Sequence, residues 1–337
     1  MPSESETARY RSLIAGFAGQ RILVAGDLML DEFIWGKVSR ISPEAPVPVV
    51  DVVAESYYPG GAANVARNVR ELTAGAAVMG LAGTDAPGRR LMRLLEAAGI
   101  DTSGVQQEAS FSTTVKTRII ARNQQVVRVD REKKTPAAAG ETERARQHLE
   151  SAMGSLDAIV VADYGKGFLT QPLADAICRA ARAHGKILAV DPHPHTCLSW
   201  RGATAIKPNR AEAFLAAGLA PSEPVIPIAE DRALAEAGAR LLRLWEPASL
   251  LITLGEHGML LFQAGAPPCH TPTRAQDVFD VSGAGDTAIA VLALGLCAGA
   301  TPAEAAELAN RASAIVVGKL GTATVTTAEL LASFPQV

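Results

Sequence analysis

Apolar, strand-like segments alternate with segments of helical periodicity along most of the chain, and this alternation restricts the possible folds more than any single motif does. Strands are predicted at Arg21–Asp27, Ala77–Gly83, Asp157–Ala162, Ile187–Val190, Ala203–Ile206, Leu250–Leu254 and Met259–Phe262. Helices are predicted at Ser5–Phe17, Gly60–Leu72, Pro87–Ala98, Thr142–Met153, Pro172–His184, from Arg210 onward, Ala233–Leu244, Thr287–Ala298 and Pro302–Val317. Such alternation produces a right-handed, mostly parallel sheet with helices on both faces, so the predicted fold class is α/β, a three-layer α/β/α sandwich.

Two strand-rich segments lack an accompanying helix. Glu32–Pro59 contains β-branched residues interrupted by prolines, which confine strands to sheet edges. Phe111–Asp130 alternates apolar and polar residues around Asn123-Gln124-Gln125, a pattern that predicts a hairpin. We expect these segments, about 32–59 and 107–131, to form a small β-sheet lid on a single domain that spans 1–337. Because open sheet edges favour pairing with another chain, we also expect a homodimer through the lid.

Polar residues stand where several predicted strands end. Asp27, Asp163, Asp191 and Asn209 all occupy such positions. In open α/β sheets, ligands bind beyond the carboxyl ends of the strands. The sequence therefore predicts a ligand site along this edge.

The segment Asp280-Val-Ser-Gly-Ala-Gly-Asp286 precedes the most apolar run of the chain, Thr287–Ala300. The backbone of Gly283, Ala284 and Gly285 is free to turn its N–H groups toward one point, and a helix start attracts phosphate or developing negative charge. Asp286, in the first helical turn, adds a proton acceptor. Transfer of a phosphoryl group to a hydroxyl requires both features. The alternative is a tight loop with an ordinary N-terminal helix charge.

Residues at three further places in the chain each have a structural and a functional interpretation. Gly60 and Gly61 either end the lid segment or let a sugar approach the backbone beside the Asn64 amide. Asp31 is either a surface charge or an acceptor for two sugar hydroxyls. Asn209 and Glu212 form a helix cap, or they hold phosphate-bound Mg²⁺ through waters, since magnesium keeps most of its own waters.

Basic side chains offer contacts for an anionic substrate. Lys166 follows a strand end, where a cation is well placed to meet a phosphate. The predicted lid carries Lys116, Arg118, Arg122 and Arg128, which are exposed sheet charges unless one or two of them close over the substrate. His193 and His195 are separated by a proline and have no third clustered ligand, so we interpret them as a surface loop and not as a metal site.

Composition excludes several classes of partner. The net charge of −3 gives no reason to expect binding to nucleic acid or to an anionic membrane. The four cysteines occur singly, which argues against structural zinc or disulfides and fits a reducing cytosol. Thr287–Ala300 is shorter than the ~20 residues that cross a bilayer. Met1–Ala8 lacks the apolar stretch of a signal peptide, so we expect a soluble, cytoplasmic protein.

The paired motifs Gly60-Gly-Ala-Ala-Asn64 and Asp280–Asp286 resemble the signatures of the ribokinase-like (PfkB) carbohydrate kinases, and the resemblance covers about Arg21 to Val325. Four shorter motifs resemble the kinase part of the bacterial heptose enzymes: Gly26-Asp-Leu-Met-Leu-Asp31, Arg40-Ile-Ser-Pro-Glu-Ala-Pro46, Arg122-Asn-Gln-Gln125 and Asp163-Tyr-Gly-Lys166. Those proteins use ATP to phosphorylate the anomeric hydroxyl of D-glycero-β-D-manno-heptose 7-phosphate for lipopolysaccharide synthesis. The chain stops at Val337, so the resemblance implies the stand-alone kinase without the nucleotidyltransferase domain that some members carry.

The resemblance also implies roles for individual residues. Asp286 is the base, and Gly283, Ala284 and Gly285 form the anion hole. The nucleotide, phosphate and Mg²⁺ are assigned to Asn209, Glu212, Thr253, Gly255, Gly258 and Asn310. The sugar phosphate is assigned to Asp31, Gly60, Gly61, Asn64, Lys116, Arg118, Arg122, Asp163 and Lys166. Many relatives also bind a monovalent cation near the positions of Asp280 and Ser282, where this chain has Val281 and Ser282 in place of the more usual Thr.

Competing interpretations remain open. A family member could act on fructose, ribose or a hexose phosphate, and the same scaffold could serve as a catalytically silent sugar or nucleotide sensor. A dinucleotide-dependent oxidoreductase fits less well, because Gly26-Asp27-Leu28 is not a Gly-x-Gly-x-x-Gly turn leading into a helix.

Overall fold

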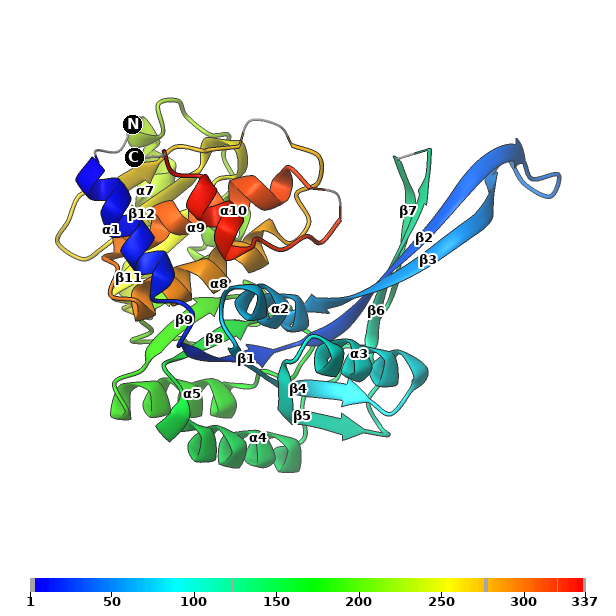
Figure 1. Ribbon diagram of the computed structural model, residues 1–337, viewed down its shortest axis with the longest axis horizontal. Coiled ribbons are helices and arrows are strands. Elements are labelled where there is room, and N and C mark those ends of the chain that lie inside the picture. The colour runs from blue at the N-terminus through cyan, green and yellow to red at the C-terminus, as the bar shows by residue number, and fades with distance from the viewer. Residues whose placement is uncertain (1–3, 123, 276–277, 320, 336–337) are drawn as a thin grey trace.

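A nine-stranded sheet forms the centre of the part of the chain that the structure describes (Figure 1). The structure is a computed structural model, and it describes residues 4–122, 124–275, 278–319 and 321–335. The strand order is β13-β12-β11-β10-β9-β8-β1-β4-β5. Seven strands are parallel: β1 (Arg21–Gly26), β4 (Gly75–Gly83), β5 (Asp101–Glu108), β8 (Ala158–Ala162), β9 (Ile187–Asp191), β10 (Ala205–Ile206) and β11 (Ser249–Thr253). The edge strands β12 (Met259–Phe262) and β13 (Cys269–Thr271) are antiparallel.

Helices cover both faces of this sheet, because the strands are apolar on both sides. In β1, Ile22 and Val24 pack into one core cluster while Leu23 and Ala25 pack into another, and all four are fully buried. The first cluster receives side chains from α1 (Glu4–Ala15), α2 (Ala62–Leu72), α3 (Ala86–Ala97), α8 (Ala284–Cys297), α9 (Pro302–Val317) and α10 (Thr327–Ala332). The second receives them from α4 (Ala139–Ala152), α5 (Gln171–Ala183), α6 (Arg210–Ala216) and α7 (Arg232–Trp245). The predicted three-layer α/β architecture is confirmed.

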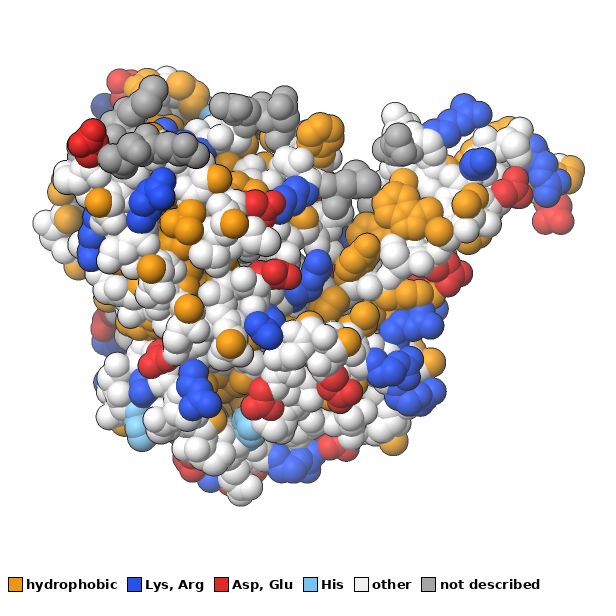
Figure 2. All heavy atoms as spheres, in the orientation of Figure 1, with side chains coloured by type: hydrophobic (Ala, Val, Ile, Leu, Met, Phe, Trp, Pro, Cys, Tyr) orange, Lys and Arg blue, Asp and Glu red, His pale blue; other side chains and the backbone are white. Residues whose placement is uncertain are grey.

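A separate four-stranded sheet projects from the main body (Figures 1 and 2). Its order is β3 (Pro48–Gly61), β2 (Leu28–Ile41), β6 (Thr114–Ala121), β7 (Gln124–Arg131), and we call it the small sheet. Strands β2 and β6 are parallel, and the outer pairs are antiparallel. The two segments predicted to form a second sheet therefore do so, although β2 starts at Leu28, directly after β1. The predicted turn residue Asn123 lies outside the described residues.

Two strands and one α-helix of the described residues were not predicted: β5, β13 and α10. Strand β5 has the sequence Asp-Thr-Ser-Gly-Val-Gln-Gln-Glu, with little apolar character. It lies at the sheet edge and pairs only with β4 among the described strands, so it needs no continuous hydrophobic pattern. Strand β13 is three residues long and also lies at an edge.

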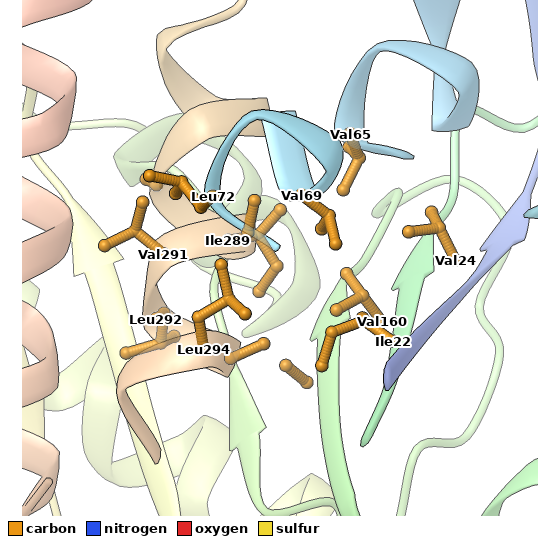
Figure 3. Packing of buried hydrophobic residues seen from close by; sticks show 14 of the residues in the cluster. Ile22, Val24, Val65, Val69, Leu72, Val160, Ile289, Val291, Leu292 and Leu294 are labelled. Atoms are coloured by element: carbon orange, nitrogen blue, oxygen red, sulfur yellow. The ribbon is translucent and has the colours of Figure 1, made fainter. Parts of the chain in front are cut away.

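Helices α2 and α8 pack against each other at the centre of the protein. Figure 3 shows Val65, Val69 and Leu72 of α2 near side chains of α8 such as Ile289. Helix α8 is buried on all sides from Thr287 to Gly295, as expected for a helix without a polar face. Within the described residues, no helix is both long and apolar enough to span a membrane.

A polar contact also crosses this helix pair. The Thr287 hydroxyl donates to Oδ1 of Asn68 at 2.7 Å, and Nδ2 of Asn68 donates to the Asn64 carbonyl at 3.0 Å. Both asparagines are at most 1% exposed. Asn64 and Asn68 lie off the apolar stripe of α2, and polar contacts bury them: Asn68 bonds to Thr287 of α8 and to the Asn64 carbonyl.

Candidate active site

The N-termini of α2 and α8 meet at the carboxyl edge of the large sheet. Gly61 caps α2 with φ 59°, and Gly283 caps α8 with φ 82°. A Cβ atom on Gly283 would lie 3.0 Å from Nδ2 of Asn64. Both glycines adopt a positive φ that other residues rarely take, and a Cβ at 283 would crowd the Asn64 amide. The positive ends of two helix dipoles therefore point to one place.

Asp286 receives a hydrogen bond on each carboxylate oxygen at this meeting point. Nδ2 of Asn64 donates to Oδ2 at 2.6 Å, and the Tyr164 hydroxyl donates to Oδ1. Burial, with a smaller contribution from the Asp191 charge, raises the pKa of Asp286 to about 6, although these two hydrogen bonds lower it. A carboxylate with this pKa is ionised at neutral pH and is a stronger base than an exposed aspartate.

The backbone of the glycine-rich turn supplies two free amides. Ala284 N–H donates to the Val281 carbonyl at 3.3 Å and is used within the turn. The N–H groups of Gly283 and Gly285 have no acceptor among the described residues. We expected all three amides to face an anion, and the structure leaves two of them available.

Lys207 lies beside this turn and was not singled out from the sequence. Its Nζ is 2.9 Å from Oδ2 of Asp191 and 3.6 Å from the position of a Cβ on Gly285. The lysine is only 3% exposed. Burial raises the pKa of Asp191, and the Lys207 ammonium opposes this. Asp191 ends β9 and Lys207 directly follows β10, so the strand-end rule that selected Asn209 also applied to Lys207.

Asn209 and Glu212 form a reciprocal helix cap. Oδ1 of Asn209 accepts from Glu212 N–H at 2.9 Å, and Oε2 of Glu212 accepts from Asn209 N–H at 2.8 Å. Burial, followed by the Asp191 charge, raises the pKa of Glu212. The described residues contain no group of three or more His, Cys, Asp or Glu suited to direct metal coordination. Glu212 and Asp191 do suit a hydrated Mg²⁺ held by one or two carboxylates and by phosphate oxygens.

A cavity of about 340 Å³ opens beside the free amides. Its size is within the range of small-ligand sites. Apart from Asn209 and Glu212, four residues were predicted to bind the nucleotide: Thr253, Gly255, Gly258 and Asn310. All four line this cavity, together with Ala284 and Gly285 of the glycine-rich turn. Its lining includes Thr253, Gly255, Gly258, Met259, Val281, Ala284, Gly285, Asn310 and Val317.

Asp31 lies in β2, near the start of this strand of the small sheet. It is 5% exposed, so it is no surface charge. Its Oδ1 accepts from Nη1 of Arg118 at 2.6 Å, and its Oδ2 would be 2.7 Å from a Cβ on Gly60. Lys116 places its ammonium 5.9 Å from the centre of the Tyr164 ring. Burial lowers the pKa of Lys116, the Asp31 charge raises it and the Lys166 charge lowers it, so these charges lie near one another.

Three residues that were predicted to bind the substrate make contacts with residues other than those around Asp286. Asp163 accepts from Gly165 N–H at 2.9 Å and from the Thr196 hydroxyl at 2.6 Å, and it shapes its own loop. Lys166 pairs with Glu132 at 2.6 Å. Arg122 donates to the Val38 carbonyl at 3.2 Å and lines a hollow of about 580 Å³ that contains no residue from around Asp286. The structure therefore does not bring Arg122 together with the other predicted residues.

The architecture and the site together define a kinase of the ribokinase-like class. The chain matches the model of the pfkB family of carbohydrate kinases over residues 20–329, and it belongs to that family. It is 46% identical over 312 residues to the protein named bifunctional protein HldE of Citrifermentans bemidjiense. The match covers 93% of this chain and 63% of that protein, so the chain spans less than two thirds of the relative's length.

Solved structures show the same fold. Phosphofructokinase-2 from Escherichia coli, in complex with potassium, superposes with a TM-score of 0.73 at 17% identity and covers 92% of this chain and 96% of its own. Arabidopsis thaliana ribokinase, complexed with ribose and ATP, gives a TM-score of 0.68 at 17% identity and covers 94% and 98%. At this identity the likeness establishes the ribokinase-like fold. The protein is a carbohydrate kinase.

Proposed function

We propose that the protein uses ATP to phosphorylate the anomeric hydroxyl of D-glycero-β-D-manno-heptose 7-phosphate, giving the 1,7-bisphosphate for ADP-heptose and lipopolysaccharide core synthesis. The observation that carries this proposal is the 46% identity to a protein named HldE across almost the whole chain. The motifs of Arg40–Pro46 and Asp163–Lys166 support the same substrate by their resemblance to the bacterial heptose enzymes.

In the proposed reaction, Asp286 accepts the proton of the sugar hydroxyl as the γ-phosphoryl group moves in line to the oxygen. In a loose transition state the hydroxyl keeps most of its proton until phosphoryl transfer is well advanced, so a carboxylate is a strong enough base. The free amides of Gly283 and Gly285, with the Lys207 ammonium beside them, stabilise charge on the phosphate oxygens. Mg²⁺, held by Glu212 and Asp191 through water, would supply further charge neutralisation.

The proposed sugar site lies between α2 and the small sheet. Oδ1 of Asn64 is buried and has no hydrogen-bond partner among the described residues. An unpaired buried acceptor is costly, and a sugar hydroxyl would satisfy it. Oδ2 of Asp31, next to Gly60, offers a second acceptor. Lys116 supplies a half-buried cation suited to a phosphate on the substrate. A small sheet acting as a lid would exclude water from the reacting atoms.

The Asp280 carboxylate, near which the resemblance implies a monovalent cation, ties two backbone segments together. Oδ1 of Asp280 accepts from Ser282 N–H at 2.9 Å, and Oδ2 accepts from Gly321 N–H at 3.2 Å. Each oxygen keeps a further lone pair. The proposed reaction assigns no step to a monovalent ion.

We further propose a cytoplasmic homodimer formed through the small sheet. Its exposed apolar side chains include Ile41, Val52 and Val53, which are 61%, 56% and 66% exposed. Figure 2 shows hydrophobic side chains on the visible face of this sheet. Burial of such a patch is favourable, and pairing would cover its open edges. Light scattering at micromolar concentration should give twice the chain mass, and a monomeric mass would contradict the dimer.

The substrate assignment is tested by ADP release with heptose 7-phosphate beside unphosphorylated heptose, fructose, ribose and hexose phosphates. We expect heptose 7-phosphate to give the highest kcat/KM and the product to carry phosphate at the anomeric carbon. A higher kcat/KM with another sugar would identify a different kinase of the same family. ATP turnover with none of them would favour a catalytically silent sensor.

A further inference from the structure

Tyr164 contacts Asp286 from a loop that belongs to neither of the two helices. The loop follows β8, and Tyr164 lies in it next to Asp163. Its hydroxyl donates to Oδ1 of Asp286, while its ring packs against the apolar core cluster that includes α2 and α8. The hydroxyl is thus the only polar atom that the side chain brings to the site.

The backbone of this loop is fixed by a buried carboxylate. Asp27, 3% exposed, accepts three amides at 3.0 Å each: Tyr164 N–H and Lys166 N–H on Oδ2, and Phe168 N–H on Oδ1. Asp163 adds a bond from Gly165 N–H. The position of the Tyr164 hydroxyl therefore follows from contacts that do not involve the substrate.

The two donors to Asp286 come from different parts of the fold. Tyr164 reaches Oδ1 and Asn64 reaches Oδ2, so rotation of the carboxylate about its bond to Cβ would break both contacts. Each oxygen accepts one donor and keeps a further lone pair. One of these lone pairs remains for the proton of the acceptor hydroxyl.

We propose that Tyr164 is a positioning residue for the base: its hydroxyl orients the Asp286 carboxylate and favours the ionised form, so that a free lone pair faces the acceptor hydroxyl. This inference rests on the proposed role of Asp286 but not on the identity of the sugar. Tyr164 itself stays protonated, because burial and then the Asp286 charge raise its pKa well above the usual value.

The charge balance gives the direction of the expected effect. Asp286 faces Tyr164 and Asn64, with Asp191 and Lys207 nearby, and Asp31 and Lys116 lie close to Tyr164 from the small sheet. The Tyr164 bond lowers the pKa of Asp286 against the raising effect of burial. Its removal therefore moves the pKa of Asp286 above about 6, while the other groups stay in place.

The test compares the wild type with Tyr164→Phe, which keeps the ring and loses the hydroxyl. We expect kcat to fall about 10- to 100-fold, as for a base misplaced by a fraction of an ångström, with KM for ATP unchanged. The acid limb of the kcat profile should move up by about one pH unit. Tyr10→Phe is the matched control, because Tyr10 stacks on Phe334 far from this loop in sequence and should leave both quantities unchanged.

A second measurement needs no sugar. Carbon NMR can follow the pH titration of the Asp286 carboxyl, with Asp286→Asn used to assign the resonance. The titration midpoint of Asp286 should be higher in Tyr164→Phe than in the wild type. A fluorinated tyrosine at position 164 is a stronger hydrogen-bond donor and should lower the midpoint of Asp286. Unchanged midpoints in a folded Tyr164→Phe would overturn the positioning role whatever sugar is phosphorylated. If no sugar is turned over but the midpoints move as expected, the proposed function fails while the Tyr164 contact stands.

Discussion

Nδ2 of Asn64 donates a hydrogen bond to Oδ2 of Asp286 at 2.6 Å, although the two residues are 222 positions apart in the chain. The contact joins the first turn of α2 to the first turn of α8. The bond from Thr287 to Asn68, at 2.7 Å, joins the same helices one turn further along α2 and one residue further along α8. The orientation of the proposed base therefore depends on the packing of two helices, in addition to the loop that carries Tyr164.

Asp286→Asn should abolish most turnover and leave the fold and ATP binding intact. Loss of a general base lowers kcat by about 10²- to 10⁴-fold. Asn keeps an oxygen for the Tyr164 hydroxyl. Steady-state kinetics and ATP titration measure the two effects. Asp175→Asn, on the exposed face of α5, is the control and should behave as wild type. A near-normal rate in Asp286→Asn would remove the assignment of the base.

The same substitution should stabilise the protein at neutral pH. The pKa of Asp286 is about 6 in the folded protein, against an ordinary value of 3.8, which we take for the unfolded chain. The folded state therefore takes up a proton more readily than the unfolded state. The cost of the buried charge is therefore full above about pH 6 and disappears below about pH 4. We expect Asp286→Asn to raise the free energy of unfolding by about 1–3 kcal/mol at pH 7.5, and the gain to shrink between pH 6 and pH 4. Urea unfolding across this range measures it, and a loss of stability at pH 7.5 would contradict the buried-charge argument.

The pH profile of kcat should fall at low pH, with a midpoint near pH 6. Asp286 must be ionised to accept a proton, so kcat should decrease about tenfold per unit below the midpoint. Asp163 titrates in the same range, because burial raises its pKa to about 6. The variant Asp163→Asn separates the two groups: the acid limb should remain if Asp286 is its source. A wild-type profile that stays flat to pH 5 would exclude Asp286 as the titrating base.

The sequence predicted the sheet, the helices and the glycine-rich turn because each depends on local patterns. Strand β1 is apolar throughout, and Gly283 needs no distant partner to end a loop with positive φ. The contacts of Asp286 depend on side chains from three separate segments, and no local pattern encodes them. Asn64 and Asn68 lie off the apolar stripe of α2, a position that predicts exposure unless the partner helix is known.

Two site residues could have been found from the sequence. Lys207 lies two residues before Asn209, and Tyr164 lies within the motif Asp163-Tyr-Gly-Lys166. Both residues follow strands, at the sheet edge where ligands bind in such folds. A single tyrosine or lysine is common in loops, so neither residue type by itself indicates a site. Only the structure brings Lys207 to within 3.6 Å of the Cβ position on Gly285 and the Tyr164 hydroxyl to Asp286.

Gly283→Ala should lower both stability and activity. The φ of 82° costs a residue with a Cβ about 1–2 kcal/mol, and the new Cβ would lie 3.0 Å from Nδ2 of Asn64. Gly299→Ala is a matched control, because Gly299 has φ 81° with nothing within 4 Å of its Cβ position. Both variants should lose stability in urea unfolding because of the positive φ, Gly283→Ala the more because its Cβ also crowds Asn64, and only Gly283→Ala should lose kcat. Equal activity in the two variants would show that the Asn64 contact is not needed.

The buried pair of Lys207 and Asp191 offers a double-variant test of the phosphate site. Lys207→Met leaves the Asp191 carboxylate without its cation, and breaking a buried ion pair in this way costs about 3–5 kcal/mol. Adding Asp191→Asn removes the stranded charge, so the double variant should regain most of the lost stability. Asp191 is also proposed to hold Mg²⁺ through water, so the double variant is compared with Asp191→Asn alone. If Lys207 also stabilises transferring phosphate oxygens, kcat should be lower in the double variant than in Asp191→Asn, although the fold is restored. Urea unfolding and kinetics on Lys207→Met, Asp191→Asn and the double variant separate these effects. Equal kcat in Asp191→Asn and the double variant would show that Lys207 serves only to neutralise Asp191, and the phosphate would then depend on the Gly283 and Gly285 amides.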